Sequence, residues 1–512
     1  LGIPAEPLFR SIHTSGGSMD KVYGEDFTME RSRLHQATPF VLKQDQGVEP
    51  SLQMDGNGTI EDPFLVRSLS DLLLMQAAVN TAGGTLKTSG GTSVTARSAA
   101  YRLTSDIDLA PVCGASSGKS WRPVGETRET SFIGVFDGDG HSISNLYIQG
   151  ENDYQGLFGI GYENRNRMGK ITGLSVSGQV HGASYVGMIV GHGGEVSSCS
   201  SDGAVVSDND SAGGIAGSVY TIDHCTNRAS VRKTRGMVHA IGGIAGTVSG
   251  KCHDCRNEGA VTSVEGYEIG GIVGYNQGQS VFNCSNTGII TGGQQCGGIA
   301  GISTGILENC LNEGNVSAGY GYCGGIAGVL DFGASLRNCV NTAQVTEESY
   351  GTGNGGICGY ARGNSSIEYA YHPGNNPLVA SFQDSSAAAS HFFTFSRWDG
   401  NDSGCVLYTT EDGFPCLALI DALNAWASES RTGEKPLCGW EYDTESGTGR
   451  LTGLPATNPA GDNFLVTVPA SLESGPEEST LEIRVASRGG FNVTSTPDWV
   501  KPGEKSPMDG VP

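Results

Sequence analysis

The chain has 512 residues, of which 79 are glycine, 7% are aromatic and 17% are charged. So much glycine, with so few helix-forming residues, favours an all-β fold with many turns. The formal net charge of −23 argues against nucleic acid or an anionic membrane as a partner, because the basic residues are scattered rather than clustered. No stretch approaches the ~18 apolar residues of a membrane-spanning helix, so the chain is not expected to be transmembrane, and no signal peptide is recognised in it.

The N-terminal part of the chain shows no repeat. Residues 1–54 are interpreted as an extended segment, and residues 55–98 as a first strand followed by a capping helix. Ser70 can cap this helix, which is expected from about Asp71 to Asn80. Its apolar residues would cover the open end of the repeat that follows, because an open end exposes unpaired backbone groups.

The loop DGNGTIED, at 55–62, alternates side chains that carry oxygen, as calcium-binding loops do. A calcium ion could therefore bind in this loop, with Asp55, Asn57 and Glu61 as the candidate ligands. The sixth position departs from the calcium pattern, because such loops have glycine there and this chain has Ile60. No other metal or cofactor is expected.

Residues 99–372 contain an internal repeat made of two signatures. The first is Gly-Gly-Ile-x-Gly or a close variant, whose copies from residue 187 onward start 26 to 31 residues apart. The second is a cysteine, followed two residues later by asparagine in five of six copies. Two signatures with the same interval mark a true repeat rather than a low-complexity segment. The repeated residues are Ile215, Ile244, Ile272, Ile299, Ile326 and Ile357, and Cys199, Cys225, Cys255, Cys284, Cys310 and Cys339.

A unit this short cannot bury its own apolar face, so each copy must stack on its neighbours. Stacking at the ~4.8 Å spacing of adjacent strands predicts a right-handed parallel β-helix, or solenoid, of about nine or ten coils. The isoleucines and cysteines then form structural ladders in the interior. The paired glycines are expected to allow positive φ and close backbone approach at the corners, and each asparagine to satisfy its own turn and the next coil.

The cysteine ladder allows other interpretations. Soft ligands at a fixed spacing could hold a metal, but no histidine or second cysteine is fixed beside each one, as zinc geometry requires. Disulfides between a few stacked pairs stay open, although six equivalent positions cannot all pair with both neighbours. Buried free thiols in the core are the preferred interpretation.

Beyond residue 372 the repeat ends. Residues 373–460 contain an amphipathic pattern at 416–430 and are predicted to form a C-terminal cap with one helix. Residues 461–512 alternate apolar and polar side chains, which predicts a small β-sandwich-like segment.

The order of motifs from residue 55 to residue 372 resembles that of the GLUG-motif proteins. The motifs are WRPVG at 121, GVFDGDGHSISNLYI at 134–148 and GLFG at 156, which leads into the Gly-Gly-Ile-x-Gly repeats. The resemblance implies an exported bacterial protein, extracellular at the cell surface or anchored to the outer membrane. The segment 461–512 resembles the opening of a BACON-like immunoglobulin-type module.

Some GLUG-motif proteins are related to immunoglobulin A peptidases, whose catalytic domain carries the zinc motif His-Glu-x-x-His. The present sequence has ten histidines and no such motif. The resemblance therefore covers the repeat region without the peptidase domain, and no enzymatic activity is predicted from it.

Tyrosines gather in the loops before the glycine signatures and are the candidate ligand-binding residues. Stacked along one edge, they would form an aromatic strip suited to sugar rings or to a protein partner. They are Tyr154, Tyr185, Tyr267, Tyr320, Tyr322 and Tyr350.

The predicted function is that of a monomeric, non-enzymatic adhesin or ligand-binding and display module. Its expected partner is a glycan, from the host or the environment, or a surface protein. The alternative is a carbohydrate-active enzyme, either a polysaccharide lyase or a glycoside hydrolase, with its site on one face of the β-helix. The acid pairs that could serve such an enzyme are Asp106 and Asp108, Asp137 and Asp139, and Asp208 and Asp210.

Overall fold

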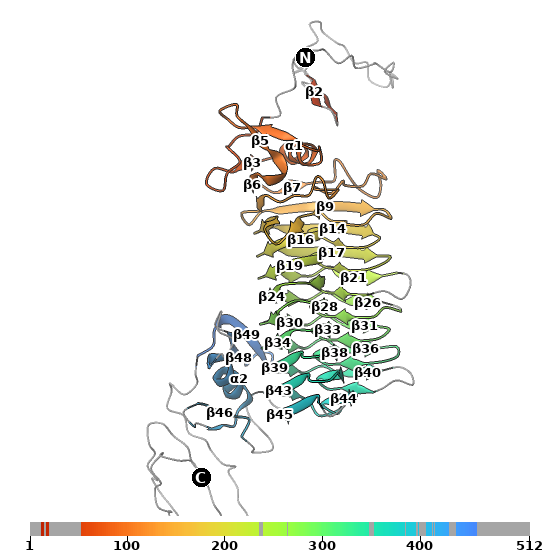
Figure 1. The fold of residues 1–512 in the computed structure, drawn as a ribbon, viewed down its shortest axis with the longest axis vertical. Helices are drawn as coiled ribbons and strands as arrows, with labels where there is room; N and C mark the ends of the chain where they lie inside the picture. Colours follow the sequence, from red (N-terminus) through yellow and green to blue (C-terminus); the bar gives the residue numbers. More distant parts are fainter. Residues whose placement is uncertain are drawn as a thin grey trace, which may run out of the picture.

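The computed structural model describes residues 53–457 except 235–238, 264, 348–352, 384–385, 396–397, 399–405, 412, 414 and 430–436, and the backbone of two short strands, β1 (Ile12–Thr14) and β2 (Gly17–Met19). The described chain winds into a rod of stacked parallel strands (Figure 1). The predicted all-β parallel solenoid is confirmed, with about eight turns where nine or ten were expected. Among the described residues, no helix is both long enough and apolar enough to cross a membrane.

Each coil contributes strands to three faces of the rod. The first face carries two strand registers, one from β3 (Phe64–Val66) to β45 (Ala388–Thr394) and one from β10 (Phe158–Ile160) to β44 (Val379–Phe382). The second face runs from β7 (Ile107–Asp108) to β45. The third is a separate seven-stranded sheet of two-residue strands. The stack therefore extends beyond the predicted limits of 99 and 372, because the coils at both ends lack the glycine signature that revealed the others.

The repeated isoleucines form one interior ladder. All six are fully buried. The amide of each of the first five donates to the carbonyl of the isoleucine in the next coil, at 2.8–3.0 Å, and the amide of Ile357 donates to the carbonyl of Leu378 at 3.0 Å. This direct stacking places equivalent residues of successive coils one above the other, as the period predicts.

The repeated cysteines are also buried, and their thiols hydrogen-bond to the backbone. Each Sγ donates to the carbonyl two residues earlier, at 3.1–3.3 Å. All 13 described cysteines are buried and free. Burial raises the pKa of Cys323 and of Cys358 to about 12. Cys323 and Cys358 are therefore unreactive thiols rather than thiolates, and burial keeps reagents away from the other described cysteines.

A thiol titration tests this arrangement. The thirteen described cysteines should react with a disulfide reagent only after the chain is unfolded in denaturant, because the reagent needs an accessible thiolate. Rapid reaction of several of them under native conditions, or fewer than thirteen thiols after unfolding, would contradict the buried, unpaired state.

The paired glycines serve close approach alone, and the expectation of positive φ at these residues is wrong. Neither Gly297 nor Gly298 has a left-handed φ. A Cβ on Gly297 would lie 2.0 Å from the carbonyl oxygen of Ala300, and one on Gly298 would lie 2.2 Å from Cγ of Asn312. The left-handed residue of this corner is Gln295, with φ of 52°. Two coils simply leave no room for a side chain at either glycine.

The asparagines that follow the cysteines form a second, polar ladder inside the rod. The Nδ2 of each of the first four donates to Oδ1 of the asparagine in the next coil, at 2.7–2.9 Å, and that of Asn341 donates to the carbonyl of Gly356 at 2.9 Å. The same Nδ2 donates to the carbonyl two residues later, at 2.8–3.1 Å. Each amide thus satisfies its own turn and the next coil, as the sequence predicted. The ladder consists of Asn227, Asn257, Asn286, Asn312 and Asn341, all buried.

Breaking this ladder should destabilise the rod. Replacing Asn286 with alanine leaves the buried amide and carbonyl of Gly288 without their side-chain partner. The free energy of unfolding should fall by about 2–4 kcal/mol in urea denaturation. The exposed Gln344 provides the control, since its change to alanine should alter stability by no more than about 0.5 kcal/mol. Equal stability of the two variants would contradict the role of the ladder.

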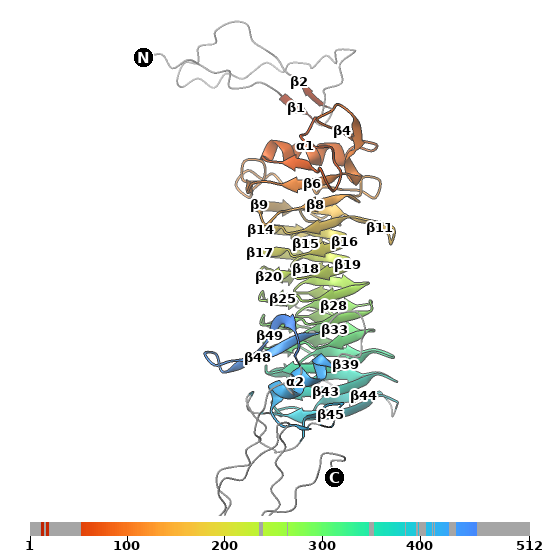
Figure 2. The ribbon, with the colours of Figure 1, turned by 90° about the vertical axis from the view of Figure 1, so that its left-hand side faces the viewer.

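One helix, α1 (Leu69–Val79), lies at the N-terminal end of the rod (Figures 1 and 2). Its N-cap is Ser68 rather than the predicted Ser70: the Asp71 amide donates to Oγ of Ser68 at 3.3 Å. The Asp71 carboxylate in turn accepts a hydrogen bond at 3.0 Å from the amide of Arg67, the residue before the N-cap. Leu72 and Met75 are fully buried in the core of the rod.

The second helix, α2 (Leu419–Ser428), falls within the predicted range of 416–430. Together with β48 (Cys438–Asp443) and β49 (Thr448–Pro455) it packs against the side of the rod rather than over its end (Figure 2). Nε1 of Trp440 donates to Oδ1 of Asn309 at 2.7 Å, and buried apolar residues of both parts form one cluster. The sandwich-like segment predicted at 461–512 lies outside the described residues.

Candidate functional site

Two neighbouring columns of side chains lie outside the apolar core of the rod. The corner column consists of one residue from each coil, the one that precedes the short strand of the third face. Most of these residues have left-handed φ values of 50–65°. The strand column belongs to the first face and follows the register of its strands. The corner column holds Tyr154, Tyr185, Ser211, Ala240, Glu268, Gln295 and Tyr322; the strand column holds His192, Ser218, Thr247, Tyr275, Ile302, Val329 and Tyr360.

An aromatic cluster occupies the N-terminal part of both columns. The rings of Tyr154 and Tyr185 stack with centroids 5.0 Å apart and planes 10° apart. The imidazole of His192 meets the Tyr185 ring at 72° and the Tyr162 ring at 89°. Tyr162 comes from β11 (Tyr162–Asn164), which projects from the side of the rod (Figure 2). Its ring also stacks on Tyr220, at 6.1 Å.

The rings of Tyr154, Tyr162, Tyr185 and His192 line an open cavity of about 340 Å³, which we call the aromatic pocket. That volume is typical of the smaller ligand sites of proteins, which combine apolar walls with a few polar groups. The walls of this pocket have the same mixed character. The residues that line it are Arg128, Tyr154, Ile160, Tyr162, Glu163, Tyr185 and His192.

Glu163 is the acidic group among these residues, and it is held in the ionised form. Arg97 donates to its carboxylate and holds the pKa of that carboxyl below its usual range. Ser131 donates to the same oxygen at 3.0 Å, and Arg167 lies 3.1 Å from the other oxygen. Glu163 therefore offers a fixed negative acceptor rather than a proton donor.

His192 is the neutral polar group of the pocket. Burial, with a smaller contribution from Arg128, lowers the pKa of its imidazole to about 4. The ring is therefore uncharged at neutral pH. Within the described chain, its Nδ1 is buried without a hydrogen-bond partner.

The low pKa of His192 predicts a pH dependence of stability. Between pH 6.5 and 4 the unfolded chain binds a proton at this histidine while the folded chain does not, so stability is lost as pH falls through that window. The loss from this group should reach about 2 kcal/mol between pH 7.5 and pH 5. Urea denaturation of the wild type and of His192→Gln at both pH values measures it. Equal pH dependence of the two proteins would contradict the assignment.

The other predicted tyrosines do not join this cluster. Tyr322 stacks on Tyr360 at 4.3 Å, five coils further along the corner column, which is about 24 Å at the spacing of adjacent strands. Tyr267 stacks on His239 at 5.6 Å, and Tyr320 is half-buried in its loop. Tyr350 lies outside the described residues. The five described tyrosines thus form separate groups rather than one continuous strip.

Sequence reasoning missed several residues of the pocket. His192 belongs to the motif HGGE, which has the wrong spacing for a zinc peptidase and by its sequence indicates only a repeat corner. Tyr162 and Glu163 lie in β11 and Arg128 in a loop, and neither segment follows the period of the repeat. The available signal was weak: the interval between GLFG at 156 and the next glycine signature at 187 lies at the long end of the range seen for the repeat, and it contains the projecting strand β11.

The candidate calcium ligands have protein partners. The Asp55 carboxylate pairs with Arg67, and the side-chain amide of Asn57 donates to Asp62. Glu61 is exposed in the same loop. The loop is therefore already held together by contacts among its own residues and Arg67.

The candidate catalytic acids also make local contacts. Asp106 accepts from the Ser142 amide at 2.8 Å, and Asp108 accepts from the Ala110 amide at 2.9 Å. Asp139 donates its amide to Asp137, which also pairs with Arg102 at 3.1 Å. Asp208 lies 3.1 Å from Nε2 of His181, and Asp210 accepts from the His239 amide. These contacts organise turns and neighbouring coils.

Comparison with known proteins identifies the repeat. The family model described as the GLUG motif matches residues 265–291, which is about one coil. Over 169 residues, or 32% of the chain, the sequence is 34% identical to halomucin of Haloquadratum walsbyi (strain DSM 16790 / HBSQ001), of which the chain spans 2%. A solved structure of a putative immunoglobulin A1 protease from Bacteroides ovatus aligns with 78% of this chain and 95% of its own, at 18% identity and a TM-score of 0.40. The chain thus contains a GLUG motif, which lies within its parallel β-solenoid.

Proposed function

We propose that the chain is an extracellular, surface-exposed β-solenoid that binds a neutral glycan in the aromatic pocket and acts as an adhesin or ligand-binding module. The observation that carries this proposal is the composition of the pocket. It combines the stacked rings of Tyr154 and Tyr185 and the ring of Tyr162 with three polar groups, those of Arg128, Glu163 and His192.

A sugar ring fits both parts of this wall. Its C–H face packs against aromatic rings, and its hydroxyls both donate and accept hydrogen bonds. Glu163 is an ionised acceptor, Arg128 is a donor, and the tyrosine hydroxyls can do either. The net charge of −23 disfavours an acidic polysaccharide, because like charges repel over the whole surface. A neutral glycan is therefore the preferred ligand.

The composition of the pocket favours binding over glycan cleavage. Glycoside hydrolases place two carboxyl groups on either side of the bond they cleave, and one must be protonated to act as an acid. Among the described residues that line the pocket, Glu163 is the one carboxyl group, and its pKa is lowered rather than raised. A carboxylate in this state suits recognition of hydroxyls.

A location outside the cell is supported by the GLUG motif at residues 265–291, because the resemblance to GLUG-motif proteins implies an exported protein. The buried thiols are compatible with an oxidising environment. Oxidation requires access to a thiolate, and all the described cysteines are buried. The rod can therefore carry free cysteines without forming disulfides.

Glycan binding can be tested with one tyrosine variant and one matched control. The wild type is screened on an array of neutral glycans, and the best ligand is titrated by calorimetry. Tyr185→Ala should weaken that binding about tenfold or more, because it removes one stacked ring from the wall. Tyr442→Ala removes a partly exposed tyrosine of β48 outside the pocket and should leave the affinity unchanged.

Three outcomes would contradict the proposal. The first is equal loss of affinity in Tyr185→Ala and Tyr442→Ala, which would place the ligand elsewhere. The second is release of new reducing ends from the glycan that disappears in Glu163→Gln, which would make the pocket an enzyme site. The third is binding to a surface protein with no response on the glycan array, which would make a protein the ligand.

A further inference from the structure

A second column of left-handed corners runs along the rod, at the residue before each repeated cysteine. Its φ values are 49–54°. Asparagine, aspartate and histidine tolerate this conformation better than other residues with a Cβ. Asn283, Asn309 and Asn338 are buried, and hydrogen bonds join them to the C-terminal segment. The two preceding corners are His224 and Asp254, where the sequence changes from amides to groups that bind metals.

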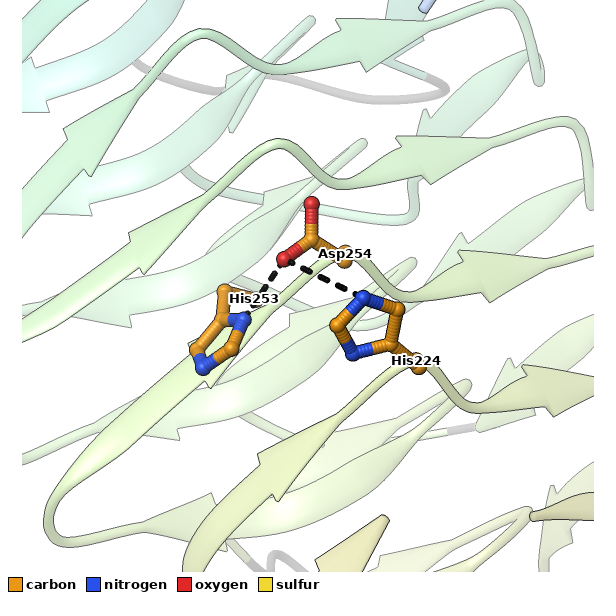
Figure 3. A group of neighbouring side chains, drawn as sticks. All are labelled: His224, His253 and Asp254. Carbon is orange, nitrogen blue, oxygen red and sulfur yellow. Dashed lines mark hydrogen bonds and ion pairs between the residues drawn. The ribbon is translucent and has the colours of Figure 1, made fainter. Parts of the chain in front are cut away.

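Three side chains converge at these two corners (Figure 3). Oδ2 of Asp254 lies 2.7 Å from Nδ1 of His253 and 3.9 Å from Nε2 of His224. All three ligand atoms lie within 4.8 Å of one another. His224 and His253 are brought together by stacking, because the amide of His224 donates to the carbonyl of His253 in the next coil.

The surrounding contacts orient each of these groups. Oδ1 of Asp254 accepts from Nδ2 of Asn283 at 3.0 Å and from Sγ of Cys438 at 3.2 Å, so Oδ2 is the oxygen that faces the histidines. The ring of His253 is buried and stacks on Phe282 at 4.7 Å. Contacts of this kind fix the direction of metal ligands in proteins.

His224 is oriented in the same way. Its Nδ1 lies 2.8 Å from Oδ1 of Asp223, so a proton on Nδ1 is shared with that carboxylate and the lone pair of Nε2 is available. The side chain of His224 is 58% exposed, whereas that of His253 is 6% exposed. The cluster is thus closed on the side of the rod and open toward solvent at His224.

We propose that His224, His253 and Asp254 bind a divalent transition metal ion of the zinc type. Nitrogen and oxygen ligands at about 2.0–2.2 Å from a tetrahedral ion lie about 3.3–3.5 Å apart. The distances of 2.7 and 3.9 Å bracket this value, so small side-chain rotations suffice. Two imidazoles and one carboxylate favour a transition metal over calcium or magnesium, which take mainly oxygen ligands.

An ion at this position would act on the junction between the rod and its C-terminal segment. Asp254 contacts Cys438 of β48, and Asn283, which contacts Asp254, also accepts from the Cys438 amide at 3.0 Å. Binding of the ion to the folded chain alone stabilises that chain by mass action. We therefore expect zinc to raise the melting temperature of the protein.

Two variants test the site with a residue that other coils already carry at the equivalent corner. His224→Asn and Asp254→Asn each install the residue that the next three corners carry at the same left-handed φ, so the rod should still fold. The full chain without a histidine tag is treated with a chelator and titrated calorimetrically with Zn²⁺. The wild type should bind one ion per chain. Each variant should bind at least about 100-fold more weakly, because changes outside the ligand set already cost 10–100-fold.

His391→Asn is the control, since His391 is an exposed left-handed corner with φ of 51° outside the cluster. It should bind zinc as the wild type does. Absence of stoichiometric binding, wild-type affinity in His224→Asn, or loss of binding in His391→Asn would overturn the proposal. Binding of Co²⁺ followed by its visible absorption gives an independent measure of the ligand set. None of these residues lines the aromatic pocket, so the zinc and glycan experiments can fail separately.

Discussion

The asparagine ladder inside the rod is the interaction on which the rest of the structure depends. A buried carboxamide must be hydrogen-bonded, and here each one has its partners in its own turn and in the two adjacent coils. This fixes the register of one coil on the next. It also explains the second glycine of the repeated pair, since a Cβ on Gly271 or Gly298 would collide with the amide of Asn286 or Asn312. The asparagine therefore requires the glycine, although the two lie far apart in each repeat.

The period of the sequence predicted which residues repeat in the interior of the rod, and it predicted little of the rest of the structure. Ile299 and Cys310 recur because every coil must fill the same space, so their ladders could be anticipated. The N-cap of α1 was misplaced because Ser68 and Ser70 both suit the position, and only the contact with Asp71 distinguishes them. The docking of α2 on the side of the rod joins residues such as Asn309 and Trp440, more than 100 positions apart, and no local pattern encodes such a contact.

The candidate sites lie where the sequence departs from the repeat. Tyr162 comes from an insertion between coils, and it completes a pocket whose other rings stand on ordinary corner and strand positions. His224 and Asp254 replace the asparagine or serine of other coils at a corner whose backbone does not change. The rod thus supplies fixed positions about one strand spacing apart, and substitution at those positions supplies the chemistry. The repeat period therefore locates the scaffold, but it does not identify the residues that differ from coil to coil.

Glycan recognition by the aromatic pocket is tested most directly by nuclear magnetic resonance of the chain with isotope-labelled tyrosine rings. Titration with a neutral glycan should shift the ring signals of Tyr154, Tyr162 and Tyr185, which line the pocket, and leave that of Tyr322 unchanged. Shifts confined to Tyr322, or no change at any tyrosine with a glycan that binds the chain, would contradict the assignment of the pocket.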